Sequence, residues 1–166
     1  MSERKRIYLC LAHMSEDGAE QRYVKEAFDT NWVVPLGPNV NGFEKDLELF
    51  IVHNSEFTVR PALEKKRVVA LSAGTAAVHL GLLNCGVKPG DEVIAQSFTF
   101  CASTHPVTYL GATPVLVDSE PDTWNIDPEL LEEAIKDRKA KTGKYPKAIV
   151  PVALYGMPYK LTASWR

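Results

Sequence analysis

The chain has 166 residues, 45% of them hydrophobic and 24% charged, with a formal net charge of −2. This is enough apolar content for a buried core, and the small charge gives no electrostatic reason to expect nucleic acid or an acidic membrane surface as a partner. The three cysteines, Cys10, Cys85 and Cys101, are odd in number and lack metal-ligand spacing, which favours a reducing compartment and no metal site. No apolar run has the length of a membrane span or follows a signal-peptide start. We therefore expect a cytoplasmic protein.

The first 66 residues predict two helices joined by a loop. Ser15 should cap a helix from about Glu16 to Asp29, and we expect its apolar face to be core: Tyr23, Val24, Ala27 and Phe28. The second helix should begin at Asn41-Gly-Phe-Glu44, which resembles a capping box. The irregular polar stretch from Asn54 to Lys66 indicates an insertion before the first strand.

The loop between these helices, Thr30 to Asn41, is unusually apolar. It is rich in Pro, Gly and Asn, yet it contains Trp32, Val33, Val34 and Val40. A loop of this kind must cover something or be covered. The residues alone are compatible with a loop that packs on its own domain.

A strand-to-helix turn follows. Val68 to Leu71 is a short apolar run that predicts a buried parallel strand, and a helix should start at about Gly74. The small turn residues would let an anion approach the backbone N–H groups at the start of this helix, and Ser72 and Thr75 could add hydroxyl donors. A phosphate is the expected guest. The alternative is that Ser72 only caps the helix and Gly74 only turns the chain.

A second strand and turn should lie at the same sheet edge. Glu92 to Ala95 predicts the strand, and Ala102 to Leu110 a following helix. Consecutive parallel strands bring their carboxyl ends to one edge, where ligands bind in open α/β sheets. Phe98 and Phe100 would then stand near the phosphate turn, either as core residues or with one ring stacked on a flat heteroaromatic ring.

The remainder predicts two more strands and one strong helix. The strands are Val115 to Val117 and Ala148 to Val152. Because Pro151 has no N–H to donate, the second strand should lie at a sheet edge or contain a bulge. Asp127-Pro128 should start the helix. Three alternating carboxylates follow the third strand, and we favour a solvated turn over a metal site for them: Asp118, Glu120 and Asp122.

Three stretches of the chain resemble, in order and spacing, the amino-terminal half of the DegT/DnrJ/EryC1/StrS family of pyridoxal-phosphate-dependent (PLP-dependent) sugar aminotransferases: LSAGTAAVHLGLLNCGVKPGDEVIAQSFTF, YLGATPVLVDSEPDTWNIDPELLEEAI and VPVALYGMP. The resemblance covers about residues 30 to 160. It implies an α/β fold, a three-layer sheet with helices on both faces, that forms part of the large domain of a fold-type-I (aspartate aminotransferase-like) PLP enzyme. Many family members have a histidine where this chain has Ala153.

Specific residues take roles from this resemblance. It implies that Ala73, Gly74 and Thr75 bind the cofactor phosphate and that Phe100 stacks on the pyridine ring. It also implies that Asn31 to Val40 forms a substrate loop near an active site shared by two subunits; within it we assign Trp32, Gly37 and Pro38.

The resemblance also implies what the chain lacks. In the family, the Schiff-base lysine and the aspartate that pairs with the pyridine nitrogen lie beyond the element matched by Tyr155-Gly156, so we assign no catalytic residue. Leu161 to Arg166 departs from the family pattern. We therefore expect a truncated or frame-shifted piece, inactive alone, that associates or has poorly ordered termini.

The predicted organisation has N-terminal helices and the substrate loop in residues 1–66, half of the PLP-binding domain in residues 67–160 and a tail in residues 161–166. The implied function of the intact enzyme is transfer of an amino group, from glutamate, to a nucleotide-linked keto sugar in polysaccharide or amino-sugar biosynthesis, by a homodimer. The alternatives are a PLP-dependent sugar dehydratase of the same family, a non-catalytic phosphate- or nucleotide-binding module, and a pseudoenzyme scaffold.

Overall fold

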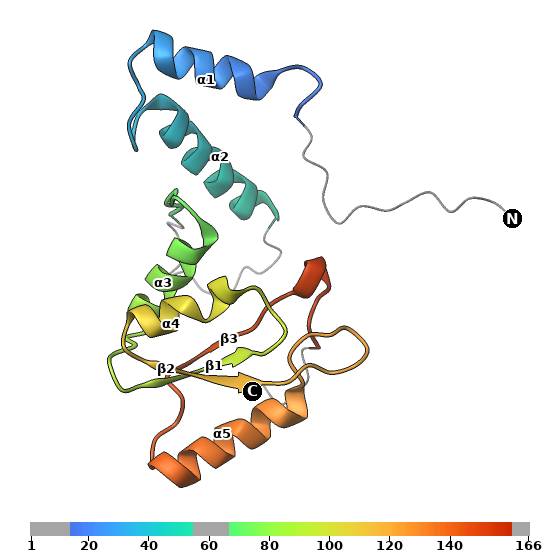
Figure 1. Cartoon of the computed structure of the whole chain (residues 1–166). Coiled ribbons are helices and arrows are strands. Elements are labelled where there is room, and N and C mark those ends of the chain that lie inside the picture. Colours follow the sequence, from blue (N-terminus) through green and yellow to red (C-terminus); the bar gives the residue numbers. More distant parts are fainter. Residues whose placement is uncertain (1–13, 55–66, 161–166) are drawn as a thin grey trace, which may run out of the picture. The chain divides into compact units, whose positions relative to one another are not determined.

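The computed structural model describes residues 14–54 and 67–160. The chain divides into two compact units, Met1–Ala70 and Leu71–Arg166. The first unit contains helices α1 and α2, and the second contains a three-stranded sheet with its helices (Figure 1).

Helix α1 (Ala19–Asp29) starts three residues later than the sequence predicts. Gly18 takes a left-handed conformation (φ 67°) at its N-cap, and the Ser15 hydroxyl accepts a hydrogen bond from the Ala19 N–H at 2.9 Å. The Glu20 carboxylate in turn accepts one from the Ser15 N–H at 3.0 Å. The prediction that Ser15 is the N-cap is therefore wrong: Gly18 holds that position, and the Ser15 side chain only accepts from the first helical N–H.

The prediction that one face of α1 is core is wrong for the described structure. No residue of this helix is buried, and Tyr23, Val24 and Phe28 are exposed. A repeat of apolar side chains identifies the face that needs covering, but the covering element must come from elsewhere. Among the described residues of this unit, nothing covers it.

Helix α2 (Pro38–Asn54) starts before the predicted capping box. Gly37 has φ 123°, where a side chain is strained, and the missing N–H of Pro38 is harmless at a helix start. Asn41 and Glu44 therefore lie inside the helix, and the predicted box is wrong. Instead, the Glu44 carboxylate accepts a hydrogen bond from the Ala70 N–H at 2.8 Å.

The predicted strand at Val68 to Leu71 does not form among the described residues. The Val68 N–H bonds to the Glu48 carboxylate at 3.0 Å, and Val69 and Leu71 are exposed. An extended segment becomes a strand only when a neighbouring strand offers a ladder of backbone groups. Here the amides of Val68 and Ala70 are satisfied by side chains of α2 instead. The predicted insertion at 55–66 lies outside the described residues.

The second unit is built on a parallel sheet of order β2-β1-β3: β1 is Glu92–Gln96, β2 is Thr113–Val117 and β3 is Ala148–Val150. The central strand β1 pairs Gln96 with Val117 on one side and Ala95 with Val150 on the other. Three of the four predicted strands are therefore present. Pro151 follows β3, an edge strand of this sheet, so it interrupts no ladder.

Both faces of this sheet are covered. Helices α3 (Gly74–Asn84) and α4 (His105–Tyr109) lie on one face and α5 (Pro128–Thr142) on the other (Figure 1). Val93 belongs to the core under α3 and α4, and its neighbour Ile94 to the core under α5. Successive side chains of a strand point to opposite faces, so a short apolar run such as β1 serves both cores.

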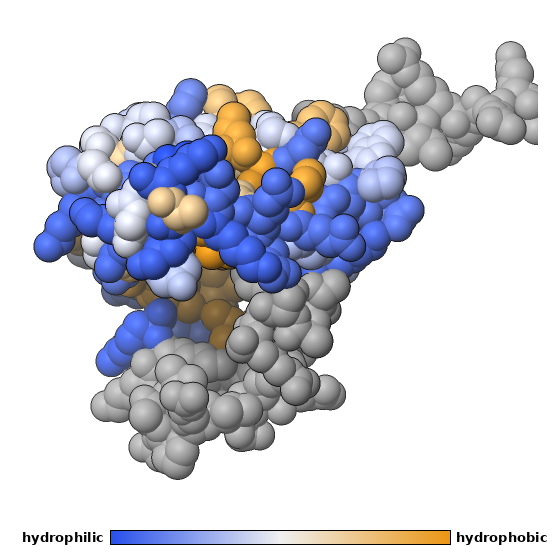
Figure 2. All heavy atoms as spheres, turned by 90° about the horizontal axis from the view of Figure 1, so that it is seen from below, coloured by the Kyte–Doolittle hydropathy of each residue, from blue (hydrophilic) through white to orange (hydrophobic). Residues whose placement is uncertain are grey.

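The α5 side of the molecule is largely hydrophilic (Figure 2). Asp127 caps α5 as predicted, since its carboxylate accepts hydrogen bonds from the N–H groups of Glu129 (2.8 Å) and Leu130 (3.2 Å). Further along α5, Arg138 forms two hydrogen bonds with the carboxylate of Glu92, at 2.9 and 3.0 Å. This bidentate pair fastens the helix to the first residue of β1.

None of the described helices combines the length and the apolar character that crossing a membrane requires.

Candidate functional site

The site lies at the carboxyl edge of the sheet. Because β1, β2 and β3 are parallel, the segments that follow them leave the same edge. These segments are residues 97–104 after β1, residues 118–127 after β2 and residues 151–157 after β3. Helix α3 packs against the short 3-10 helix η2 (Cys101–Ser103) in the first of these segments.

The first turn of α3 offers backbone donors. Ala73 is the N-cap in an extended conformation, and its carbonyl accepts hydrogen bonds from the N–H groups of Ala76 and Ala77. Within the described part of the chain, the N–H groups of Gly74 and Thr75 have no acceptor. No atom lies within 4 Å of where a Cβ of Gly74 would sit. Free amides, open space and the positive end of the helix dipole fit a phosphate group.

The two phenylalanines after β1 are both outside the core. Phe100, next to η2, is 78% exposed, and Phe98 is 49% exposed. The ring of Phe98 makes an edge-on contact with Trp124, with centroids 6.0 Å apart. The interpretation of either ring as an ordinary core residue is therefore wrong for the described structure. Phe100 is free to stack on a ligand, while Phe98 already has an aromatic partner.

The assigned loop of the first unit packs closely on itself. A Cβ at Gly37 would lie 2.8 Å from the ring of Trp32, so only glycine allows this approach. The Trp32 N–H donates to the Ala27 carbonyl at the end of α1. Pro38 begins α2. The loop therefore has a fixed shape in its own unit, and its role toward a substrate stays a prediction.

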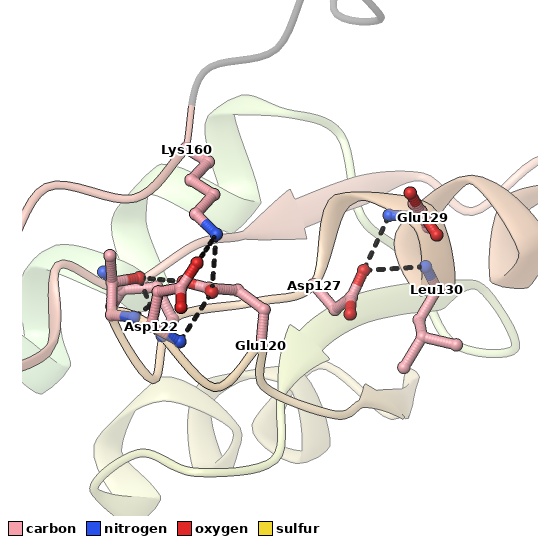
Figure 3. A network of polar contacts seen from close by, with 8 residues as sticks. Glu120, Asp122, Asp127, Glu129, Leu130 and Lys160 are labelled. Atoms are coloured by element: carbon pink, nitrogen blue, oxygen red, sulfur yellow. Dashed lines mark hydrogen bonds and ion pairs between the residues drawn. The ribbon is translucent and has the colours of Figure 1, made fainter.

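Two of the three alternating carboxylates after β2, Glu120 and Asp122, form an ion-pair network with Lys160 (Figure 3). The Lys160 ammonium lies 2.8 Å from Glu120 and 2.6 Å from Asp122. Lys160, the Thr123 hydroxyl and the N–H groups of Asp122 and Thr123 donate to Glu120 and lower its pKa from 4.5 to about 2. The same carboxylates raise the pKa of Lys160.

This network corrects the sequence interpretation of a solvated turn for Glu120 alone, because Asp118 and Asp122 are exposed. Glu120 is only 4% exposed and is satisfied by protein donors. Among the residues that the structure describes, no group of three or more His, Cys, Asp or Glu side chains is arranged to hold a metal. The carboxylates instead tie Lys160 to the segment after β2.

Sequence reasoning missed two buried amides at this edge. Gln96, the last residue of β1, and Asn125 are both 0% exposed. Gln96 donates to the Phe98 carbonyl (2.7 Å) and accepts from the Ile126 N–H (3.2 Å). Asn125 accepts from the Leu154 N–H (2.8 Å) and donates to the Met157 carbonyl (2.9 Å). For Gln96 the available signal was a polar residue in an apolar strand, since such a residue is buried only with partners, whereas Asn125 lies outside any strand and gave no such signal.

A hollow of about 480 Å³ lies beside this network. Its lining combines the two aromatic rings with hydroxyl and carboxylate groups: Ser97, Phe98, Asp118, Ser119, Glu120, Pro121 and Trp124. The hydroxyl of Ser119 is buried and has no hydrogen-bond partner among the described residues. The hollow contains none of the residues that the sequence assigned to the cofactor.

Comparison with known proteins places the chain in one family of aminotransferases. A model of the DegT/DnrJ/EryC1/StrS aminotransferase family matches residues 14–164. EpsN of Bacillus subtilis (strain 168), a candidate pyridoxal phosphate-dependent aminotransferase, is 46% identical over 157 residues, which are 95% of this chain and 37% of EpsN. GDP-perosamine synthase of Caulobacter vibrioides is 40% identical over 156 residues, 94% of this chain and 36% of that protein.

The structural comparison includes a cofactor-bound enzyme. The crystal structure of NtdA from Bacillus subtilis, with bound cofactor PMP, matches with a TM-score of 0.68 and 32% sequence identity. The match covers 89% of this chain and 30% of that chain. The chain thus spans little more than a third of the length of the curated relatives above.

Proposed function

The chain belongs to the DegT/DnrJ/EryC1/StrS family of PLP-dependent aminotransferases, and on that premise we propose that it forms the part of a sugar aminotransferase that holds the cofactor phosphate. Its second unit is part of the α/β large domain of this fold-type-I family, as the sequence predicts. The observation that carries the proposal is the first turn of α3, with two free amides and open space at Gly74.

In this proposal, backbone groups bind the phosphate and an aromatic ring orients the cofactor. The N–H groups of Gly74 and Thr75 donate to phosphate oxygens, with Ala73 setting the extended approach of the chain. The exposed ring of Phe100 covers one face of the pyridine. When bound, PLP supplies the electron sink for amino-group transfer, while the protein binds and orients it.

The substrate class comes from the relatives. GDP-perosamine synthase carries a nucleotide sugar in its name, and another relative is UDP-2-acetamido-2-deoxy-3-oxo-D-glucuronate aminotransferase. We propose that the enzyme formed with this chain aminates a nucleotide-linked keto sugar with glutamate as the donor. The 166 residues alone are proposed to be inactive, because the family's Schiff-base lysine has no counterpart among them.

A homodimer is part of the proposal. Apolar side chains of α1 and α2 are exposed, including Tyr23, Phe28 and Phe43, and exposed apolar area of this kind supports association with a partner. The substrate loop with Trp32, Gly37 and Pro38 would belong to an active site completed by the second subunit. The cytoplasmic location stays a prediction.

The proposal is tested by ligand titration of the 166-residue chain. Binding of PLP is followed by absorbance and compared with pyridoxal, which lacks the phosphate, and with GDP. We expect PLP to bind more tightly than pyridoxal, because the phosphate contributes the charge-assisted hydrogen bonds. Equal affinity for PLP and pyridoxal would contradict the phosphate site. Binding of GDP with no response to PLP would favour the nucleotide-binding alternative.

A further inference from the structure

The turn after β3 holds an exposed aromatic residue in a strained backbone conformation. Tyr155, in the 3-10 turn η3 (Leu154–Gly156), has φ 52° and ψ 26° and is 70% exposed. A residue with a side chain adopts this left-handed region at a cost that glycine does not have. Strain of this kind persists only where the surroundings enforce it, and it is concentrated at ligand-binding sites.

The surroundings that enforce it are the side chain of Asn125. Its amide accepts a hydrogen bond from the Leu154 N–H at 2.8 Å and donates one to the Met157 carbonyl at 2.9 Å. Both ends of the turn are therefore attached to one buried side chain, with Tyr155 between the two attachment points. The carbonyls of Ala153 and Leu154 close the turn by accepting from the N–H groups of Gly156 and Met157.

The clamp continues to neighbouring segments of the same unit. Gln96 accepts a hydrogen bond from the N–H of Ile126, the residue next to Asn125, and donates to the Phe98 carbonyl. Lys160 fastens the chain downstream of the turn to Glu120 and Asp122 (Figure 3). The turn follows β3, and the segment that carries Phe100 follows the neighbouring strand β1 at the same edge of the sheet. These hydrogen bonds therefore fix the turn relative to that segment.

We propose that Tyr155 contacts the sugar ring of the substrate and that Asn125 is the positioning residue that holds it there. The inference rests on the proposed function for its substrate class. A phenol suits a sugar ring, because its apolar face packs on C–H groups and its O–H reaches hydroxyls. A tyrosine also loses little conformational entropy on binding, since it has few rotatable bonds. A role in stabilising the fold by burial does not explain why a tyrosine occupies this position, because the Tyr155 side chain is mostly exposed.

The first test compares nucleotide sugars with the bare nucleotides by calorimetry. The 166-residue chain is titrated with GDP-mannose and GDP, and with UDP-N-acetylglucosamine and UDP. In at least one of these two pairs, we expect the nucleotide sugar to bind more tightly than its bare nucleotide. Tyr155→Ala should weaken binding of that nucleotide sugar by about two- to tenfold and leave the affinity for the bare nucleotide unchanged. Tyr155→Phe should retain part of the gain, because it keeps the ring.

A second variant separates binding from folding. Tyr155→Gly removes the strain, so its thermal midpoint should equal or exceed that of the wild type, while its loss of sugar affinity should match that of Tyr155→Ala. If the tyrosine were purely structural, Tyr155→Gly would lower the thermal midpoint and leave the affinity for the nucleotide sugar unchanged.

The positioning role of Asn125 is tested by a double-mutant cycle. Asn125→Asp should weaken sugar binding in the wild-type background and have no further effect when Tyr155 is already alanine. Aspartate can still accept from the Leu154 N–H but cannot donate to the Met157 carbonyl, so hydrogen exchange should increase at the Met157 amide, which closes the turn. Asn84→Asp, the same change at the exposed end of α3, is the matched control and should do neither.

The inference is overturned if Tyr155→Ala binds the nucleotide sugars as the wild type does, or if the wild type fails to distinguish them from the bare nucleotides. PLP is titrated into the same samples. Retained PLP binding with no sugar response contradicts only this inference, whereas absent PLP binding contradicts the proposed function.

Discussion

Glu120 remains a carboxylate at a nearly buried position because protein donors surround it. Burial alone disfavours the charged form, but Lys160, the Thr123 hydroxyl and two backbone N–H groups outweigh it and lower the pKa to about 2. A carboxyl whose pKa falls on folding stabilises the fold above its ordinary pKa of 4.5. This contribution is lost as the pH falls from that value toward about 2.

Lys160→Met should therefore raise the pKa of Glu120. The donors on Asp122 and Thr123 remain, so the pKa should stay below its ordinary value. Acid loosening of the segment after β2 should start at a higher pH than in the wild type. Carboxyl carbon shifts measured by NMR across the acid range report both effects.

Lys144→Met is the matched control, because Lys144 is exposed and its ammonium has no ion pair among the described residues. It should leave the titration of Glu120 unchanged. An unchanged Glu120 titration in Lys160→Met would show that the ion pair does not hold this carboxylate.

At the level of elements, α5 owes its start to the Asp127 cap. The carboxylate satisfies two N–H groups of the first turn, and Pro128 needs no acceptor there. Asp127→Ala should lower the free energy of unfolding by about 1 kcal/mol, measured by urea denaturation. Glu133→Ala, at an exposed site in the same helix, should leave it nearly unchanged. Equal effects of the two substitutions would contradict the cap.

Sequence patterns predicted the elements whose causes are local. The starts of α3 at Gly74 and of α5 at Pro128 follow from turn and cap residues within a few positions, and both are confirmed. The strand at Val68 to Leu71 was wrong because strand formation depends on a neighbour that local sequence cannot specify. The buried face predicted for α1 failed for a related reason.

The same limit applies to the candidate site. The position of the turn before α3 could be predicted because its small residues and its helix are contiguous, and its phosphate role stays a prediction. Asn125 was missed because its partners, Leu154 and Met157, are 29 and 32 positions away. The strained backbone at Tyr155 could not be predicted either, because the sequence Leu154-Tyr155-Gly156 does not require a left-handed conformation at the tyrosine.

At the level of the whole molecule, we expect the exposed face of α1 to govern association. Phe28 is 66% exposed and Val24 58% exposed, and burying them against a second copy would remove apolar area from water. We expect the wild-type chain to self-associate with increasing concentration in sedimentation velocity. Phe28→Glu should shift it toward the monomer, because association would bury an unpaired charge.

Lys25→Ala, on the same helix, serves as the control and should leave association unchanged, since Lys25 only pairs with Asp29 at the surface. A wild type that stays monomeric at every accessible concentration, or a Phe28→Glu variant that associates as before, would contradict this account of the first unit.

The central claim, that the first turn of α3 binds the cofactor phosphate, is tested most directly by PLP titration of Gly74→Ala beside Gly81→Ala. Both glycines lie in α3 with nothing within 4 Å of an added Cβ, so both variants should fold, and Gly81→Ala should gain about 0.5 to 1 kcal/mol of stability. We predict that Gly74→Ala loses PLP affinity while Gly81→Ala binds as the wild type does. Undiminished PLP binding by Gly74→Ala would contradict the account.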